Sequence, residues 1–357
     1  MIGPVRHPAS AERDAATPST TEPRRRSLVT GGAGFIGSHL TRQLLARGDH
    51  VTIIDDLSTG RRENLPIGQE RDVRFIEGKV GAMLPAIGRG EHFDEIYHLA
   101  AAVGVRLVVQ EPIGCVESNV EETAALLRFA NTRQTTQGRV GVPTLLASSS
   151  EIYGKSTKTP FAEDDDVAYG PTTVGRWSYA MTKAIDEYLG LAYHSKHNLP
   201  VVITRFFNTV GPGQVGDYGM VLPRFVKSAL AGDEIEVHGD GKQSRCFCDV
   251  RDVVESLPRL MAKPECSGRV FNVGSDEPIS IGSLAELVIR TVSSRSVVRF
   301  VPYSEAFSQG FEDLRARLPD LNRVRSAIGF APRIGLVQTI RDVAATMGWK
   351  RSGESGL

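Results

Sequence analysis

The segment "TGGAGFIGSHL", residues 30–40, decides the fold because it joins a strand to a helix through a run of glycines. The short apolar run before it, "SLVT" at 27–30, is typical of a buried strand. The stretch after it, "FIGSHLTRQLLARG" at 35–48, carries apolar residues at helical spacing and stops at a glycine. The segment therefore predicts a strand–turn–helix unit.

The turn has the pattern G-x-G-x-x-G, preceded by one further glycine. Its members are Gly31, Gly32, Gly34 and Gly37. Glycines allow a tight turn and let the backbone approach a pyrophosphate, whose charge faces the N-terminus of the helix. A glycine-rich turn without a ligand is the alternative. The strand and helix on either side favour a dinucleotide site.

Asp55 ends the next apolar run, "HVTIID" at 50–55. A carboxylate at this place accepts hydrogen bonds from a ribose 2′-hydroxyl and repels a 2′-phosphate, which favours NAD over NADP. Arg61 and Arg62 follow closely and weaken this preference slightly.

Strand-like and helix-like segments continue to alternate up to residue 207. Further strands are predicted at 73–78, 93–100, 143–149 and 200–206, and further helices at 114–133 and 177–198. Such alternation predicts an α/β fold, a Rossmann-type doubly wound parallel sheet with helices on both faces.

Three parts are expected along the chain. Residues 1–26, rich in Pro, Ser, Thr and Arg, predict a disordered leader, and 27–207 the NAD-binding domain with the catalytic residues. Beyond "NTVGPGQVGDYG" at 208–219, shorter mixed segments predict a smaller α/β substrate-binding lobe over 208–350, interleaved with the first domain.

The bulk composition excludes several classes of protein. Lys+Arg and Asp+Glu both number 42, so nothing favours nucleic acid or an anionic membrane as a partner. No apolar run approaches the roughly 18 residues needed to span a bilayer. The four cysteines do not form paired CxxC units, which argues against a metal site and predicts free buried thiols in a reducing, cytoplasmic setting.

A candidate catalytic pair stands in "SYAMTK" at 178–183. Tyr179 and Lys183 are four residues apart and so share a helix face. The lysine can lower the pKa of the phenol, which would then act as a base. Ser149, at the end of the preceding strand, can bond the same substrate hydroxyl. Taken alone, the pair would be a half-buried tyrosine beside a surface lysine.

A second polar group ends the same strand, in "ASSSEIYG" at 147–154. Ser149 and Glu151 alternate onto one side, so both can face a substrate. The alternative for Glu151 is a solvated or paired carboxylate at a strand end.

Taken together, these motifs resemble an extended short-chain dehydrogenase/reductase of the nucleotide-sugar epimerase/dehydratase/decarboxylase superfamily, over about residues 27–348. The matching motifs are "GGAGFIGSHL", "HLAA" (98–101), "SSSEIYG", "SYAMTK", "RFFNTVGP" (205–212) and "FNVGS" (271–275).

The resemblance implies that NAD stays bound and that Tyr179 removes the C4 hydroxyl proton of a UDP-linked sugar while C4 is oxidised. The implied cofactor contacts are Gly31, Gly34, Phe35, Ile36, Gly37, Asp55, Leu99, Tyr179 and Lys183. The implied substrate contacts are Ser149, Ser150, Asn208, Arg245 and Arg317. A homodimer through the helices at 113–134 and around Tyr179 is also implied.

The reaction that follows the oxidation is left between three subtypes. "GRWSY" at 175–179 and "GFEDLRARLPD" at 310–320, with Arg317, resemble decarboxylases of UDP-glucuronate, and Glu151 would lie near the leaving carboxylate. Segment 102–109, "AVGVRLVV", resembles 4,6-dehydratases and 4-epimerases instead. Decarboxylation is favoured, and a non-catalytic NAD-binding scaffold is the alternative from another class.

Two positions depart from the pattern of the superfamily. Lys79 stands where an aspartate near the adenine is usual, and Gly213 stands where an arginine often follows "GP". We therefore expect altered contacts to the adenine and to the substrate.

Overall fold

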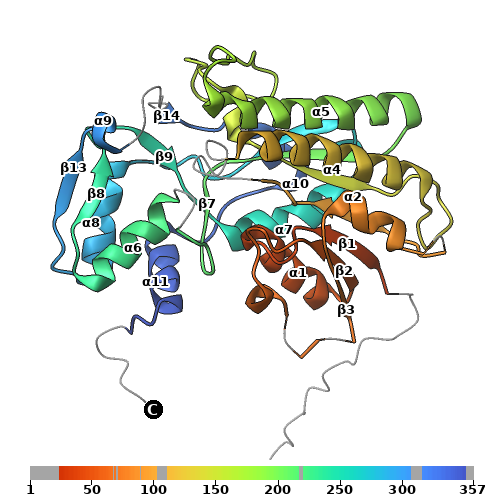
Figure 1. Ribbon diagram of the computed structural model, residues 1–357, viewed down its shortest axis with the longest axis horizontal. Helices are drawn as coiled ribbons and strands as arrows, with labels where there is room; N and C mark the ends of the chain where they lie inside the picture. The colour runs from red at the N-terminus through yellow and green to blue at the C-terminus, as the bar shows by residue number, and fades with distance from the viewer. Residues whose placement is uncertain are drawn as a thin grey trace, which may run out of the picture.

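The computed structural model describes residues 24–66, 68–69, 71–88, 90–102, 111–216, 220–306 and 316–350. Its elements form a domain built on one large sheet and a smaller lobe beside it, on the right and left of Figure 1 respectively.

Seven parallel strands form the large sheet. They are β1 (Arg26–Thr30), β2 (His50–Asp55), β3 (Val73–Glu77), β4 (Glu95–His98), β5 (Thr144–Ser149), β6 (Val201–Phe206) and β11 (Arg269–Val273). Their order across the sheet is β3-β2-β1-β4-β5-β6-β11, and every neighbouring pair is parallel. The strand order reverses between β1 and β4, and ligands of such sheets bind beyond the carboxyl ends of the strands at this point. The predicted doubly wound parallel sheet is confirmed.

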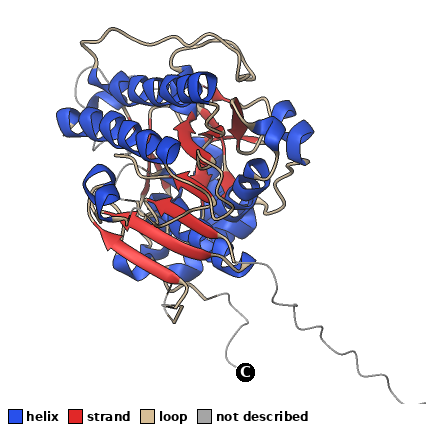
Figure 2. Ribbon diagram, turned by 90° about the vertical axis from the view of Figure 1, so that its right-hand side faces the viewer, coloured by secondary structure: helices blue, strands red, loops and turns tan. Residues whose placement is uncertain are grey.

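Helices cover both faces of this sheet. Those of one face are α1 (Phe35–Arg47), α7 (Val250–Met261) and α10 (Asn322–Ile328), and those of the other are α2 (Val80–Met83), α4 (Pro112–Thr132) and α5 (Ser178–His197). Figure 1 shows α4 and α5 side by side above the sheet and α1 beside β1 and β2, and Figure 2 shows the strands between the two helical layers.

The alternation of side chains along the strands builds the two halves of the core. On β1, Leu28 packs with the core on the α4 side, whereas its neighbour Val29 packs with the core on the α1 side. On β2, Ile54 and Ile53 divide in the same way. Parallel strands covered on both faces read as near-continuous apolar runs, which explains the composition of these strands.

The smaller lobe combines short sheets with helices. Its strands are β7 (Thr209–Val210), β8 (Ile235–His238), β9 (Ser244–Cys246), β10 (Cys248–Asp249), β12 (Pro278–Ser280), β13 (Val298–Val301) and β14 (Ala316–Arg317). Its helices are α6 (Val221–Ala231), α8 (Ile281–Val292), α9 (Tyr303–Ala306) and α11 (Leu336–Thr346). The strands pair as β12-β9-β14, β8-β13 and β7-β10, and α6, α8 and α11 pack around a core of their own. The mixed α/β lobe is therefore confirmed, and the chain is interleaved, because β11, α7 and α10 return to the first domain.

Five short 3-10 helices complete the described elements. They are η1 (Arg62–Asn64), η2 (Leu84–Ala86), η3 (Ser150–Tyr153), η4 (Gly175–Trp177) and η5 (Pro264–Cys266). None of the helices that the structure describes is long and apolar enough to cross a membrane.

The chain is ordered slightly earlier than the leader predicted over 1–26. Arg24 and Arg25 form ion pairs with Asp72 and Glu95, at 2.6 and 2.8 Å, and β1 begins at the next residue. The predicted leader is therefore too long by Arg24, Arg25 and Arg26, because ion pairs hold the first two and strand pairing holds the third. Residues 1–23 lie outside the described part of the chain.

The four cysteines are free and buried, as predicted. They are Cys115, Cys246, Cys248 and Cys266. Across the described ranges, no group of three or more His, Cys, Asp or Glu residues is placed to hold a metal ion.

Candidate functional site

The turn after β1 can be made only by glycines. Gly31 has a φ of +72°, and a Cβ on it would lie 2.7 Å from the backbone nitrogen of Ala100. A Cβ on Gly37 would lie 2.0 Å from the carbonyl oxygen of Gly31. Gly34 is the N-cap of α1, and no side chain caps the first N–H groups of that helix. These groups, with their positive partial charge, are therefore open to an anion.

Asp55 lies against this turn at the end of β2. Its carboxylate accepts the N–H of Ala33 at 2.9 Å and the N–H of Leu57 at 2.8 Å. Burial raises the pKa of Asp55, and these backbone bonds oppose the rise. Arg62, which could have bound a 2′-phosphate, forms an ion pair with Glu77 instead. This arrangement favours an unphosphorylated ribose.

The other residues predicted to contact the cofactor border the same edge. Phe35 and Ile36 form the first turn of α1 and are half-buried. Leu99 follows β4, and its N–H donates to the carbonyl oxygen of Thr30 at 3.1 Å. The residues present fit a dinucleotide: the glycines leave room for its pyrophosphate, and the uncapped helix offers N–H donors to it.

Replacing Gly37 by alanine should remove this fit. We expect NAD affinity to fall about tenfold or more, because overpacking of this kind costs about 1–3 kcal/mol. Calorimetric titration with NAD measures it. Gly114→Ala is the matched control: a Cβ there would have no atom within 4 Å, and alanine is more favourable than glycine inside a helix. Equal NAD affinity of both variants would contradict the assignment of the turn.

Tyr179 and Ser149 come together from two elements. Tyr179 lies in the first turn of α5, and Ser149 ends β5 and forms the N-cap of η3, its Oγ accepting the N–H of Glu151 at 3.2 Å. Burial raises the pKa of Tyr179 well above its usual range, and the charges of Glu151 and Asp186 act in the same direction. The hydrogen bond with Ser149 opposes this rise.

Lys183 is placed differently from our expectation. It is buried, and its ammonium donates to Oδ2 of Asp186 at 3.1 Å. Burial raises the pKa of the phenol, and a carboxylate offsets the lysine charge, so the lowering of the Tyr179 pKa by Lys183 stays a prediction. The pair still shares one helix face, as the spacing predicted.

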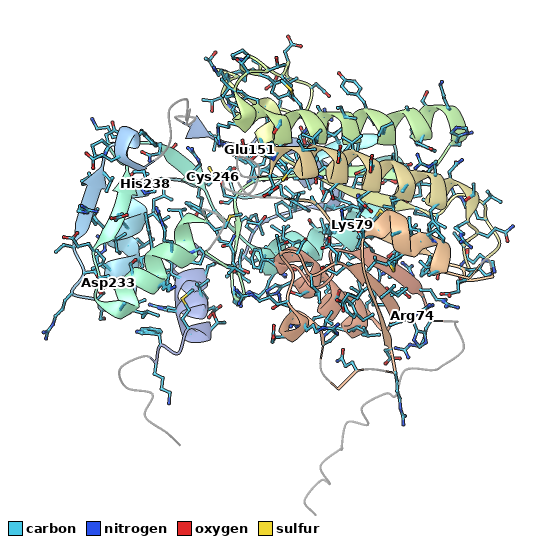
Figure 3. All side chains as sticks on the ribbon, in the orientation of Figure 1. Arg74, Lys79, Glu151, Asp233, His238 and Cys246 are labelled. Atoms are coloured by element: carbon cyan, nitrogen blue, oxygen red, sulfur yellow. The ribbon has the colours of Figure 1, made fainter. Side chains whose placement is uncertain are left out.

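Glu151 is surrounded by arginines. Its Oε1 accepts a hydrogen bond from Nη1 of Arg317 at 2.6 Å, and its Oε2 lies 3.6 Å from Nη2 of Arg176. Burial opposes its ionisation, but the charges of Arg317, Arg176 and Arg245 and the hydrogen bond hold the pKa of Glu151 below its usual range. Figure 3 shows Glu151 and Cys246 where the two lobes meet.

These arginines reach Glu151 from three elements. Arg317 of β14 is paired in register with Arg245 of β9, so the smaller lobe presents both guanidiniums together. Arg176 lies in η4, immediately before α5. All three side chains are largely buried. Arg245 also donates to the carbonyl oxygen of Ser244 at 2.8 Å.

Two further predicted substrate contacts lie next to this cluster. Asn208 donates from Nδ2 to the carbonyl oxygen of Cys246 at 3.2 Å and accepts the N–H of Cys248 at 3.2 Å, so it holds the strands that carry Arg245. Ser150 begins η3 and is buried.

Sequence reasoning assigned no role to two residues of this site. Arg176 precedes Tyr179 by three positions, and Asp186 follows Lys183 by three. Residues three apart are neighbours on a helix surface, so the acidic residue beside Lys183 could have been found from its spacing. Nothing in the local pattern marked Arg176 as a partner of Glu151.

Both positions that depart from the superfamily pattern lie in the described part of the chain. Lys79 is exposed at the start of α2, beyond the end of β3, and Figure 3 shows it on the sheet domain. Gly213 has a φ of +82°, and a Cβ there would have no atom within 4 Å. Nearly all of segment 102–109, and residues 310–315, lie outside the described residues.

A dinucleotide turn on a parallel sheet, with serine, tyrosine and lysine beyond its strand ends, defines an enzyme of the short-chain dehydrogenase/reductase class. Residues 27–274 match the model of the NAD dependent epimerase/dehydratase family, and the chain belongs to this family. Its cofactor is NAD, and it is an enzyme that modifies nucleotide sugars.

Curated relatives include two decarboxylases. The chain is 36% identical over 340 residues to the UDP-N-acetyl-alpha-D-glucosaminuronate decarboxylase of Bacillus cytotoxicus, covering 93% of this chain and 99% of the relative. It is 35% identical to UDP-glucuronic acid decarboxylase 4 of Arabidopsis thaliana, covering 88% of this chain and 66% of the relative.

Similar solved structures include an epimerase and a dehydratase. The UDP-N-acetylglucosamine 4-epimerase of Methanobrevibacter ruminantium, in complex with UDP-N-acetylmuramic acid, has a TM-score of 0.80 at 27% identity, covering 91% of this chain and 99% of that one. The dTDP-glucose 4,6-dehydratase of Streptomyces venezuelae, solved with NAD, has a TM-score of 0.77 at 28% identity, covering 91% and 98%.

Proposed function

We propose that the enzyme decarboxylates a UDP-linked hexuronate through a transient 4-keto sugar. The observation that carries this proposal is the placement of Glu151 among three guanidiniums. The charges of all three arginines act on this one carboxylate, and a guanidinium binds a carboxylate with paired hydrogen bonds. A buried site lined by these guanidiniums suits a substrate that brings a carboxylate of its own.

The oxidation uses the residues beside the cofactor. NAD held by the turn would supply the hydride acceptor for C4 and, once reduced, the hydride donor for the ketone. As the phenolate, Tyr179 would accept the proton of the C4 hydroxyl, Ser149 would bond the same oxygen, and Lys183 would bond the nicotinamide ribose. The product of this step is a 4-ketone, which makes the uronate a β-keto acid.

The carbon–carbon bond then breaks. The bond between C5 and the carboxylate carbon cleaves, its electron pair moves into an enolate at the C4 oxygen, and carbon dioxide leaves. C5 takes up a proton from solvent, and the ketone is reduced while Tyr179 returns its proton. Departure of carbon dioxide removes a negative charge from beside Glu151, so repulsion between the two carboxylates favours this step.

The charge state of Glu151 weighs against dehydration. In a 4,6-dehydratase the glutamate at this place would have to remove the C5 proton. A carboxylate whose pKa is held below its usual range is a weak base and is poorly suited to that task. Simple 4-epimerisation would have no use for an arginine-bound carboxylate. Both remain outcomes of the test below.

Relatives with two different sugars support a uronate as the substrate. The names of the Bacillus and Arabidopsis enzymes both specify a uronate linked to UDP, with and without an N-acetyl group. We propose UDP-glucuronate or its N-acetylated analogue as the substrate of this chain.

Incubation with both uronates and with UDP-glucose, followed by mass analysis, tests the proposal. Loss of carbon dioxide from a uronate is the expected result. Loss of water would indicate a dehydratase, and a new isomer of unchanged mass an epimerase. Bound NAD without turnover of any sugar nucleotide would support the non-catalytic scaffold.

We also propose that two copies of the chain associate through α4 and α5. These helices lie side by side on the surface and expose apolar side chains. Ile113 and Tyr188 are 73% and 75% exposed, and Val116 and Ile185 are partly exposed as well. A second copy placed there would cover an apolar surface that is costly to leave in water.

Tyr188→Glu should therefore shift the protein toward monomers at micromolar concentration. A charge buried in an apolar interface lacks a partner and is strongly unfavourable. Light scattering after size-exclusion chromatography measures the mass. Val140→Glu, at another exposed apolar residue outside these helices, is the control and should leave the mass unchanged. A wild-type monomer would contradict the proposal.

We further propose a cytoplasmic location. Free buried cysteines suit a reducing compartment. Cell fractionation that recovers the protein outside the cytoplasm would overturn this.

A further inference from the structure

Lys183 and Asp186 form an ion pair deep in α5, beside the catalytic tyrosine. Their side chains are 3% and 4% exposed, and Nζ of Lys183 lies 3.1 Å from Oδ2 of Asp186. An ammonium has three N–H donors, so one is used here and two remain for other acceptors. A buried charge pair needs further hydrogen bonds to offset the loss of hydration.

The second oxygen of Asp186 lacks such a bond. Oδ1 is buried and accepts no hydrogen bond from any residue that the structure describes. Burial raises the pKa of Asp186, and Lys183 and the nearby Thr123 hydroxyl oppose the rise, although that hydroxyl donates to the carbonyl oxygen of Asn119 at 2.9 Å. One carboxylate oxygen of Asp186 therefore has no hydrogen bond among the described residues, and this unfavourable arrangement lies beside Lys183.

The neighbouring histidine, His98, carries no charge near neutral pH. His98 lies between hydroxyls, with Nδ1 2.7 Å from Oγ1 of Thr30 and Nε2 3.1 Å from Oγ1 of Thr123. Burial and the charge of Lys183 lower the pKa of His98 to about 3, so the ring is neutral. Glu187, next to Asp186 in sequence, is bound by Arg205 at 2.7 Å. The carboxylate that balances Lys183 is thus that of Asp186.

We propose that Asp186 is a positioning residue for the oxidation step. Its carboxylate takes one donor of Lys183, directs the other two toward the ribose of the bound dinucleotide, and offsets the lysine charge at Tyr179. The helix makes this possible, because Asp186 follows Lys183 by three residues and so lies on the same face. This role concerns oxidation at C4, so it rests on the proposed oxidation and does not depend on which reaction follows.

Two charged groups act directly on Tyr179, namely Glu151 from η3 and Asp186 from α5. Glu151 is in turn acted on by Arg317 from β14, Arg176 from η4 and Arg245 from β9, and Lys183 acts on the neutral ring of His98, which ends β4. Glu151 is bound by its arginines, so its charge is largely balanced. Asp186 is the carboxylate whose removal would leave a nearby cation, Lys183, unbalanced.

Asp186→Asn tests the proposal, because asparagine keeps an acceptor for Lys183 and removes only the charge. In the complex with NAD, the ultraviolet titration of the Tyr179 phenol should move to lower pH by about one unit. The same titration is recorded for the double variant that carries both Asp186→Asn and Tyr179→Phe. Subtracting its spectra removes the signal of the other tyrosines and leaves that of Tyr179. The acid limb of the pH profile of kcat should move by the same amount, and the Kd for NAD should change less than about threefold.

Asp186→Ala separates positioning from charge. It removes the acceptor as well, so the Kd for NAD should rise about tenfold. Asp186→Glu retains the charge but moves it by one methylene, and should keep the wild-type pH profile while weakening NAD binding. If Asp186→Asn does not fold, the glutamate and alanine variants decide the question.

Two results would overturn the role of Asp186. One is an unchanged phenol titration in a folded Asp186→Asn, and the other is wild-type NAD affinity in Asp186→Ala. A purely structural residue would lower the melting temperature without moving either quantity. Glu187→Gln is the matched control for such a loss, because it removes a buried carboxylate of the same helix that bonds Arg205 rather than Lys183.

Discussion

Replacing Tyr179 by phenylalanine is expected to lower kcat by about 10³-fold with every sugar nucleotide that the enzyme accepts. The phenol is the group beside Ser149 that can take the C4 hydroxyl proton, and without it the sugar cannot be oxidised at C4. The variant keeps the aromatic ring, so packing at the start of α5 should persist. Steady-state rates, measured from product formation by mass analysis, give the effect.

The measurement needs two controls. NAD affinity of the Tyr179→Phe variant should stay within about threefold of wild type, because the phenylalanine leaves the glycine turn and Lys183 unaltered. Tyr188→Phe removes a phenol oxygen from an exposed position of the same helix and should retain full activity. Wild-type turnover by Tyr179→Phe would remove the basis of the whole mechanism, including the role of Asp186.

Replacing Glu151 by glutamine is expected to lower the rate of decarboxylation by about 10²-fold. Glutamine can still accept a hydrogen bond from Arg317, but it places no negative charge beside the leaving carboxylate. Three guanidiniums would then hold the substrate carboxylate more tightly, so we expect KM and kcat to fall together. Oxidation at C4 should continue, because Ser149, Tyr179 and Lys183 are unchanged.

The reduced nicotinamide signal distinguishes this outcome from a general loss of activity. In a single turnover, Glu151→Gln should accumulate reduced nicotinamide and the 4-keto uronate, whereas Tyr179→Phe should show neither. Glu117→Gln, at an exposed position of α4, is the control for the same exchange outside the site. Decarboxylation by Glu151→Gln at the wild-type rate would refute the role that we assign to the carboxylate.

The cofactor turn could be predicted because most of its determinants are local. The atoms nearest to a Cβ on Gly34 or Gly37 belong to the same strand–turn–helix unit, whereas Gly31 is required by its positive φ and by the approach of Ala100 beyond β4. Asp55 ends the neighbouring strand, and parallel pairing of β1 with β2 brings it to the turn. Within such a unit, the number of residues between two side chains largely decides how far apart they lie in the folded chain.

The electrostatics of the catalytic helix could be predicted only in part. The spacing of Tyr179 and Lys183 placed both on one face of α5, which the structure confirms. It did not reveal that Lys183 is bound by Asp186 or that burial raises the pKa of the tyrosine. A pKa depends on burial and on every charge nearby, and these belong to the folded molecule.

The sequence by itself therefore determined the sheet, the dinucleotide turn and the candidate oxidising residues, because periodicity, glycine spacing and strand ends act over short stretches. Tertiary structure alone decided the surroundings of Glu151. Arg317 lies 166 residues further along the chain and reaches Glu151 only because β14 pairs with β9 in the smaller lobe. Arg176 arrives from η4, immediately before α5. Charge at this carboxylate is a sum over groups that only the packing of the two lobes brings together, and that sum is the basis for proposing loss of a substrate carboxylate.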